Sequence, residues 1–358
     1  RMFGGAVGVA GDALGAAAGA VADAGRAALG AGRLTAEWVW RNAPLASVAR
    51  DATAAGRRLA DWARSRLNCT SDPPTADGTG GSGHALIVVA GISSSWDGTG
   101  NAIGLPAHAL GYDDSEVRSF SYNGAFAPYT AADTWGDLDV AAIRLGAQLR
   151  QMQRENPGRE VDLVAHSQGG VVVDLFLQHV YDAADPAYPP IGTVVTLSSP
   201  HRGAPIATAA RDVGTSPAGK AVLGAAAGAV GLPSPDAPAA RQLAEGSGLM
   251  TGLWRHRLPD HVDFTSIGAP DDPVVPASQI DVPGGQRVVV DPAGVLQEHD
   301  AITHDARAMS AVRLALEGRP PPCVGVGEAL RDAVEPVAIT RLEHAAGHVG
   351  RAVGALVP

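Results

Sequence analysis

Lysine is almost missing from this chain of 358 residues, where Lys220 is the only one. The 27 Lys and Arg residues face 37 Asp and Glu residues, so the formal charge is -10. No dense basic patch is visible to neutralise phosphates, which excludes a nucleic-acid partner. Charged residues make up only 18% of the chain, while an apolar share of 46% permits a sizeable buried core.

Cysteine is also scarce, because the chain has only Cys69 and Cys323. Cys69 precedes the first expected core strand, and Cys323 follows the last expected core helix. A disulfide between them would close the ends of the core domain and would imply an oxidising, extracytoplasmic or secreted setting. The alternative is two free thiols in a cytosolic protein.

A long uninterrupted apolar run is missing from the N-terminal segment. Gly11, Gly15 and Gly19 are spaced four apart and would share one helix face, as in membrane helix contacts. Asp12 and Asp23 interrupt this run, and a charge inside a bilayer is unfavourable. We therefore expect a helix that packs in the protein or associates with a membrane surface, with insertion as the alternative.

The chain divides into four expected parts. Residues 1–70 form an Ala/Gly-rich helical extension, and residues 71–83 form a linker. Residues 84–320 alternate short apolar strands with helices, which predicts an α/β domain with a mainly parallel sheet and helices on both faces. Residues 204–261 interrupt that alternation as an insertion, and residues 321–358 form a C-terminal helical segment. The expected strands are 86–89, 117–122, 161–165, 193–197, 262–267 and 287–290; the expected helices between and after them are 131–155, 169–180 and 301–316.

The sequence Ala165-His166-Ser167-Gln168-Gly169-Gly170 lies directly between an expected strand and an expected helix. This context is typical of a nucleophile elbow, a strained turn that requires small residues around the serine. Ala165 and Gly169 meet that requirement. The turn would expose the Ser167 hydroxyl at the helix N-terminus, where the N–H of Gln168 could stabilise an oxyanion.

On these residues, the region from Ala85 to Gly318 resembles the α/β-hydrolase family, in particular its bacterial lipases, esterases and inositol-deacylase-like lipases. The resemblance implies the order serine, acid, histidine. It places the second oxyanion donor at Ile92, after the first strand, and the acid at Asp272, with Asp271 as the alternative. It places the base at His299, with His304 as the alternative. The family usually has glycine where Ala165 stands.

The resemblance implies a serine carboxylic-ester hydrolase that forms an acyl-enzyme on Ser167. A hydrophobic or lipid ester is the expected substrate, because Gln242-Leu243-Ala244-Glu245-Gly246-Ser247 resembles the mobile lid of lipases. His201 is expected to be structural. No cofactor is implied, and no cluster of residues has the spacing of metal ligands. The alternatives are an acyltransferase with the same triad, or a membrane-associated secreted effector in which the helical flanks have the main role.

Overall fold

The protein is described from a computed structural model, which covers residues 45–71, 83–215, 220, 223, 233–270, 272–290, 299–334, 340, 341 and 344. Contacts divide the chain into residues 1–56 and 57–358. Of the first unit, the structure describes only the beginning of helix α2 (Leu45–Ser65). The glycine-rich face at Gly11, Gly15 and Gly19 lies outside the described residues.

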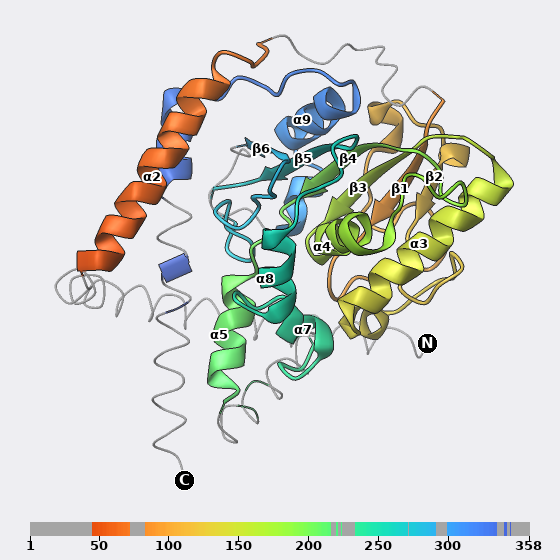
Figure 1. Ribbon diagram of the computed structural model, residues 1–358, viewed down its shortest axis with the longest axis horizontal. Helices are drawn as coiled ribbons and strands as arrows, with labels where there is room; N and C mark the ends of the chain where they lie inside the picture. The colour runs from red at the N-terminus through yellow and green to blue at the C-terminus, as the bar shows by residue number, and fades with distance from the viewer. Residues whose placement is uncertain are drawn as a thin grey trace, which may run out of the picture. The chain divides into compact units, whose positions relative to one another are not determined.

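The second unit is built on a six-stranded, fully parallel sheet in the order β2-β1-β3-β4-β5-β6 (Figure 1). This confirms the predicted fold class. The central strands are apolar because both of their faces are buried, as parallel sheets require. The strands are β1 (Ala85–Val89), β2 (Val117–Ser119), β3 (Val161–His166), β4 (Ile191–Leu197), β5 (Asp263–Gly268) and β6 (Gln286–Val289).

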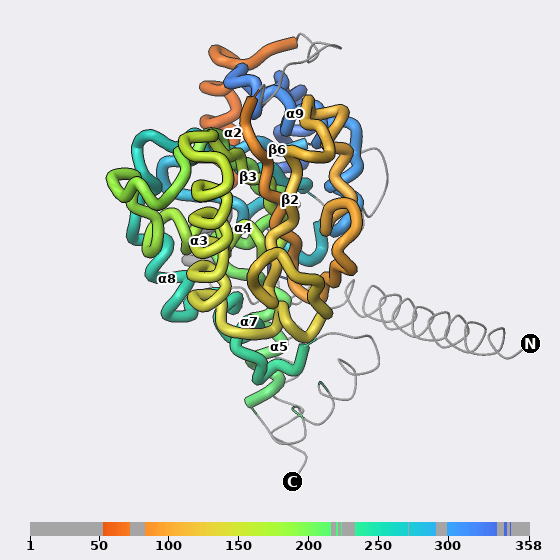
Figure 2. Tube along the Cα trace, turned by 90° about the vertical axis from the view of Figure 1, so that its right-hand side faces the viewer, coloured from red at the N-terminus to blue at the C-terminus, as the bar shows by residue number. Residues whose placement is uncertain are grey.

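Helices cover both faces of the sheet (Figure 2). On one face, α3 (Leu138–Glu155) and α4 (Gln168–Leu175) pack over Ile87 and Val89 of β1. On the other face, α9 (Ala306–Leu316) packs over Leu86 and Val88 of the same strand. Alternate residues of one strand therefore enter two different cores, because successive side chains point to opposite faces.

Shorter elements complete the unit, and they lie mostly in the connections between the strands. Asp137 caps α3 by accepting hydrogen bonds from two backbone N–H groups, so the predicted helix 131–155 is two elements. The additional elements are η1 (Ala107–Leu110), η2 (Asp114–Glu116), η3 (Ala131–Trp135), η4 (Phe176–Val180), α5 (Pro205–Val213), α7 (Pro238–Gln242), α8 (Gly248–Arg255) and η5 (His299–Thr303), followed by a helix over residues 326–334.

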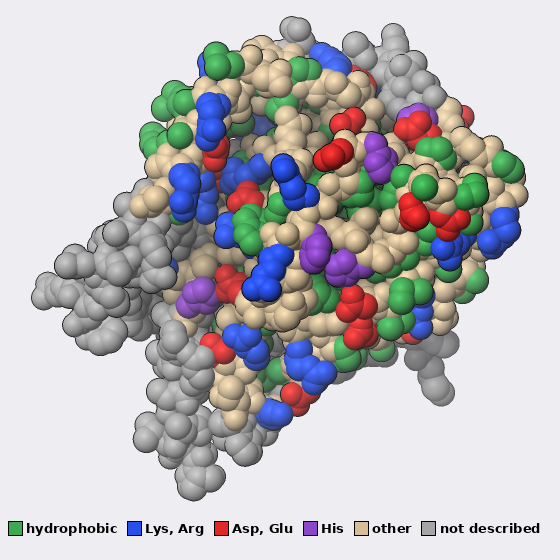
Figure 3. All heavy atoms as spheres, viewed as in Figure 1, with side chains coloured by type: hydrophobic (Ala, Val, Ile, Leu, Met, Phe, Trp, Pro, Cys, Tyr) green, Lys and Arg blue, Asp and Glu red, His purple; other side chains and the backbone are tan. Residues whose placement is uncertain are grey.

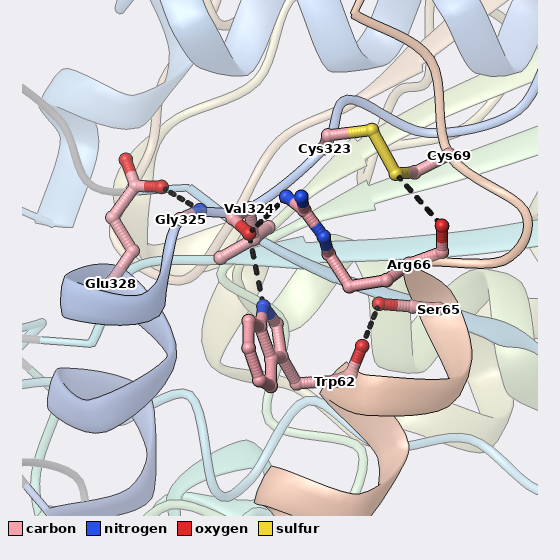
Figure 4. Close-up of a disulfide and its surroundings, with 8 residues drawn as sticks. All are labelled: Trp62, Ser65, Arg66, Cys69, Cys323, Val324, Gly325 and Glu328. Atoms are coloured by element: carbon pink, nitrogen blue, oxygen red, sulfur yellow. Dashed lines mark hydrogen bonds between the residues drawn. A yellow bond between two sulfur atoms is a disulfide. The ribbon is translucent and has the colours of Figure 1, made fainter.

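The predicted disulfide between Cys69 and Cys323 is present (Figure 4). It joins the segment after α2 to the segment after α9, and the backbone reinforces the connection. Thr70 N–H donates to the Pro321 carbonyl at 2.9 Å, and Cys323 N–H donates to the Thr70 carbonyl at 2.9 Å. The two ends of the domain are therefore fixed to each other.

Candidate active site

Ser167 occupies a sharp turn between β3 and α4. Its backbone has φ 57° and ψ -130°, a combination that is unfavourable for a residue with a side chain. The turn persists because its neighbours are fixed: Ser167 N–H donates to the Leu197 carbonyl at 2.9 Å, and Gly170 N–H donates to the Ser167 carbonyl at 3.1 Å. The backbone therefore has the strained form that a nucleophile elbow requires.

Two glycines allow other backbone segments to approach this turn. A Cβ at Gly91 would lie 2.6 Å from the Cβ of Ser167, and a Cβ at Gly169 would overlap the carbonyl oxygen of Val89. Glycine at both positions lets the loop after β1 lie directly against the serine and lets α4 begin against the end of β1. The loop carrying Ile92 is thus beside the Ser167 side chain.

The N–H groups of Gln168 and Ile92 are available at this point. Gln168 is the first residue of α4, so its N–H has no partner within the helix. Among the described residues, no acceptor is hydrogen-bonded to the Ile92 N–H. The Gln168 side chain lies elsewhere and donates to the Thr134 carbonyl at 2.9 Å. One backbone donor therefore follows the serine in the chain, and the other belongs to the residue after Gly91, which contacts the serine.

Asp272 and His299 are brought together at the carboxyl edge of the sheet. His299 Nδ1–H donates to Asp272 Oδ2 at 2.7 Å. The other carboxylate oxygen accepts the N–H groups of Val274 at 2.8 Å and Val275 at 2.9 Å. Burial favours a higher pKa for Asp272, but the charge and hydrogen bond of His299 and the Val275 N–H outweigh it, so its pKa lies below the usual value. Asp272 is therefore a fixed anion.

The second ring nitrogen of His299 is buried and has no hydrogen-bond partner among the residues that the structure describes. Because Nδ1 carries the proton of the hydrogen bond to Asp272, Nε2 keeps its lone pair and can accept a proton. His299 also lies beside the elbow. Its ring centroid is 4.7 Å from that of His166, and its carbonyl accepts a hydrogen bond from His166 Nε2 at 3.2 Å.

The alternative residues lie apart from this pair or outside the described ranges. Asp271 is not among the described residues. His304 is exposed, and its ring lies next to Gly104, where an added Cβ would be 2.9 Å from the ring Cε1. In the described part of the chain, no hydrogen bond joins His304 to Asp272 or Ser167.

His166 contacts the proposed base, a role that the elbow motif does not reveal. Burial, followed by the charge of His299, lowers the pKa of His166 to about 3. It is therefore neutral at physiological pH, and its Nε2–H supports the backbone of His299. In the sequence, only its position directly before Ser167 could have indicated this role.

His201 forms a second histidine–aspartate pair, with a different character. Its Nδ1 lies 3.3 Å from Asp174 Oδ2, and its Nε2 lies 3.1 Å from Thr196 Oγ1. All three side chains are buried. Both ring nitrogens of His201 have partners, which agrees with the structural role expected from the sequence.

The string Gln242–Ser247, which the resemblance implies to be a mobile cover, packs between α3 and the segment before α5. Leu243 and Ala244 are buried, and the Leu243 carbonyl accepts the Ala204 N–H at 2.8 Å. The Gln242 side chain accepts the Leu138 N–H at the start of α3 at 2.9 Å. This string is therefore packed against the domain in this structure, and its mobility stays a prediction.

Among the described residues, no group of three or more His, Cys, Asp or Glu is arranged to hold a metal ion. Within those ranges, no helix combines the length and apolar character needed to cross a bilayer.

The parallel sheet, with its serine elbow at the carboxyl edge, defines the α/β-hydrolase fold. Residues 82–215 match a family described as "Putative serine esterase (DUF676)". This match spans β1 to α5 and includes Ser167. No curated protein matches the chain.

Several solved structures are similar to this chain at low identity. The mature lipase BlEst2 of Bacillus licheniformis is 19% identical, with a TM-score of 0.43, over 65% of this chain and 91% of that one. The metagenomic carboxyl esterase MGS0156 is 18% identical, with a TM-score of 0.41, over 77% and 80%. Phospholipase PlaB of Legionella pneumophila is 13% identical, with a TM-score of 0.42, over 73% and 63%.

Proposed function

We propose that the protein hydrolyses carboxylic esters through an acyl-enzyme on Ser167. The observation that carries this proposal is the position of His299, which is held by Asp272 at 2.7 Å and lies against the elbow with Nε2 unpaired. The match of residues 82–215 to a serine esterase family supports the same reaction class.

In this mechanism, Ser167 Oγ attacks the ester carbonyl while His299 Nε2 takes the hydroxyl proton. Asp272 stabilises the imidazolium that forms. The N–H groups of Ile92 and Gln168 stabilise the oxyanion of the tetrahedral intermediate. The proton then passes to the leaving alcohol, and water repeats the sequence on the acyl-enzyme to release a carboxylic acid and free Ser167.

A hydrophobic acyl group is the proposed substrate feature. Apolar side chains that are only partly buried come from elements following the carboxyl ends of β1 and β4, namely Ile92, Trp96, Ala207 and Leu249. Such side chains can bind a hydrocarbon chain next to the reacting carbonyl.

The remaining proposals concern organisation and location. The catalytic domain is proposed to span residues 84–320, since β1 begins at Ala85 and α9 ends at Leu316. Residues 204–261 are its insertion, and residues 1–70 and 321–358 are its helical flanks. The disulfide supports an extracytoplasmic or secreted location, because such bonds persist in oxidising compartments.

The test is hydrolysis of nitrophenyl esters of increasing acyl length by the wild type, Ser167→Ala, His299→Ala and His304→Ala. We expect kcat/KM to fall by about a thousandfold or more for the first two variants and to remain within about threefold of wild type for His304→Ala. A preference for longer acyl chains would support the hydrophobic substrate.

A fluorophosphonate probe provides an independent measurement of the nucleophile. It should label the wild type and His304→Ala but not Ser167→Ala. Labelling that persists in Ser167→Ala, or an equal loss of activity in His304→Ala, would overturn the triad assignment.

A further inference from the structure

We infer a second binding site, for a carboxylate with an apolar tail, in a cavity lined by α2, the edge strand β6 and the helix over residues 326–334. The cavity has a volume of about 430 Å³, which lies within the range of small-molecule sites. All of its lining residues belong to the unit 57–358. The inference does not depend on the proposed esterase function.

One of the two arginines in the cavity wall is already neutralised. Arg287 donates to Asp332 through Nη1 at 2.8 Å and to the Ala277 carbonyl through Nη2 at 3.1 Å. Asp281 lies 3.1 Å from its Nε. Burial favours a lower pKa, but Asp332 and Asp281 outweigh it, and the pKa of Arg287 is raised. Its Nε is buried without a hydrogen bond among the described residues, but the two aspartates already balance the charge of Arg287.

Arg58 is the other arginine, and one of its N–H groups lacks a hydrogen-bond acceptor among the described residues. Its Nη1 is buried and has no hydrogen-bond partner among the described residues. Burial, followed by the like charge of Arg287, lowers its pKa, yet a guanidinium remains protonated. A buried donor without an acceptor is unfavourable. An anion entering the cavity would supply that acceptor, and a carboxylate matches the planar guanidinium.

The wall also holds three aspartates, each of which is paired with an arginine: Asp61 with Arg64, and Asp281 and Asp332 with Arg287. Most of the remaining wall is apolar and aromatic. Trp62 and Trp254 contribute indole rings, and Val288 and Val289 contribute aliphatic surface. The Nε1–H of Trp62 is used by the Val324 carbonyl at 2.9 Å, so this ring offers mainly apolar surface to the cavity. A ligand with a carboxylate at Arg58 and a hydrocarbon or aromatic body would satisfy both parts.

The site is held in place from both ends of the domain. Figure 4 shows the hydrogen bond from Trp62 to the Val324 carbonyl and, beside it, the disulfide between Cys69 and Cys323. On the face drawn in Figure 3, basic and acidic side chains gather along α2 and beside it. A preformed cavity can bind an anionic ligand at Arg58 without a large rearrangement of the protein.

The test is calorimetric titration of the full chain with octanoate, with 1-octanol as a neutral probe of matched length and with inorganic phosphate as an anion without a tail. Arg58→Gln removes the unpaired cation. Arg57→Gln is the matched control, because Arg57 is exposed on the same helix. We expect saturable binding of octanoate that is at least tenfold weaker in Arg58→Gln and unchanged in Arg57→Gln. Binding of 1-octanol and phosphate should be weaker than that of octanoate in the wild type.

Ligand-free stability separates a binding defect from a folding defect. Removing a guanidinium whose Nη1 is buried without an acceptor should leave the Tm of Arg58→Gln unchanged or raise it. Octanoate should raise the Tm of the wild type and of Arg57→Gln more than that of Arg58→Gln. If Arg58→Gln does not fold, Trp254→Ala, a change at a half-exposed ring, should weaken octanoate binding instead. Octanoate binding that is absent, or that is equal in the wild type and these variants, would overturn the inference, as would equally tight binding of phosphate. Because Ser167 is not altered, these outcomes are independent of the esterase test.

Discussion

The second ring nitrogen distinguishes the two buried histidine–aspartate pairs of this domain. His201 has partners on both nitrogens, so neither is free to accept a proton from a substrate or a nucleophile. His299 is bonded only through Nδ1, and its Nε2 is left unpaired among the described residues. Proton transfer requires such a free nitrogen, and this difference supports the role that we propose for His299.

His166 predicts a pH dependence of folding stability. Its pKa is about 3 in the folded protein and about 6.5 when the chain is unfolded. The unfolded chain therefore binds the proton first, and stability falls as the pH decreases from about 6.5 towards 3, by up to about 1.4 kcal/mol per pH unit. The pKa of Asp272 is lowered, so its contribution is lost only below about pH 4.

Denaturant unfolding between pH 7 and 5 measures this slope. We expect His166→Gln to reduce it relative to the wild type, because the titrating group is gone. His304→Gln removes an exposed histidine and should leave the slope as it is. A slope that is identical in the wild type and His166→Gln would contradict the assignment.

The proposed catalytic residues could be chosen from the sequence, but the contacts that hold them could not. Ser167 stands in a local pattern of strand, turn and helix, and Asp272 and His299 follow strands in the expected order. The contact between His166 and His299 joins residues separated by 133 positions. No periodicity or local motif encodes such a contact, because it depends on how two loops meet at the sheet edge.

At the scale of elements, the close approach of α4 to β1 determines where the serine lies. Gly169→Ala would place a methyl group against the Val89 carbonyl and force α4 away from the strand. We expect a loss of about 1–3 kcal/mol in unfolding free energy and at least a tenfold loss of kcat/KM, because the Ser167 turn would move with the helix.

Gly252→Ala on α8 is the matched control. A Cβ there meets nothing within 4 Å, so alanine should stabilise the helix by about 0.5–1 kcal/mol and leave kcat/KM unchanged. Chemical denaturation and ester hydrolysis measure both variants. Equal behaviour of the two would show that the approach of α4 to β1 is not what fixes the serine.

The sequence predicted where the six described strands lie along the chain better than it predicted their ends. The second strand is expected over 117–122, but it ends at Ser119 because it lies at the sheet edge, where only β1 pairs with it. The helix expected over 131–155 is interrupted because Gly136 is extended and Asp137 caps a new helix. Apolar periodicity does not record such caps.

At the scale of the whole molecule, segments 254 residues apart in sequence are joined by the disulfide. The positions of the two cysteines at the ends of the core predicted this bond. The cavity with Arg58 could not be predicted, because its walls come from four segments that become neighbours only in the folded chain.

Removal of the disulfide should therefore affect stability more than catalysis. Cys69→Ser with Cys323→Ser releases a long loop in the unfolded chain, and we expect unfolding free energy to fall by about 2–5 kcal/mol. Asp272 and His299 are held by their own loop contacts, so kcat/KM at moderate temperature should stay within about twofold of wild type. Denaturant unfolding of this variant, and of the wild type with and without a reductant, measures the difference. A large loss of kcat/KM in the folded variant would mean that the segments joined by the disulfide also position the proposed catalytic residues.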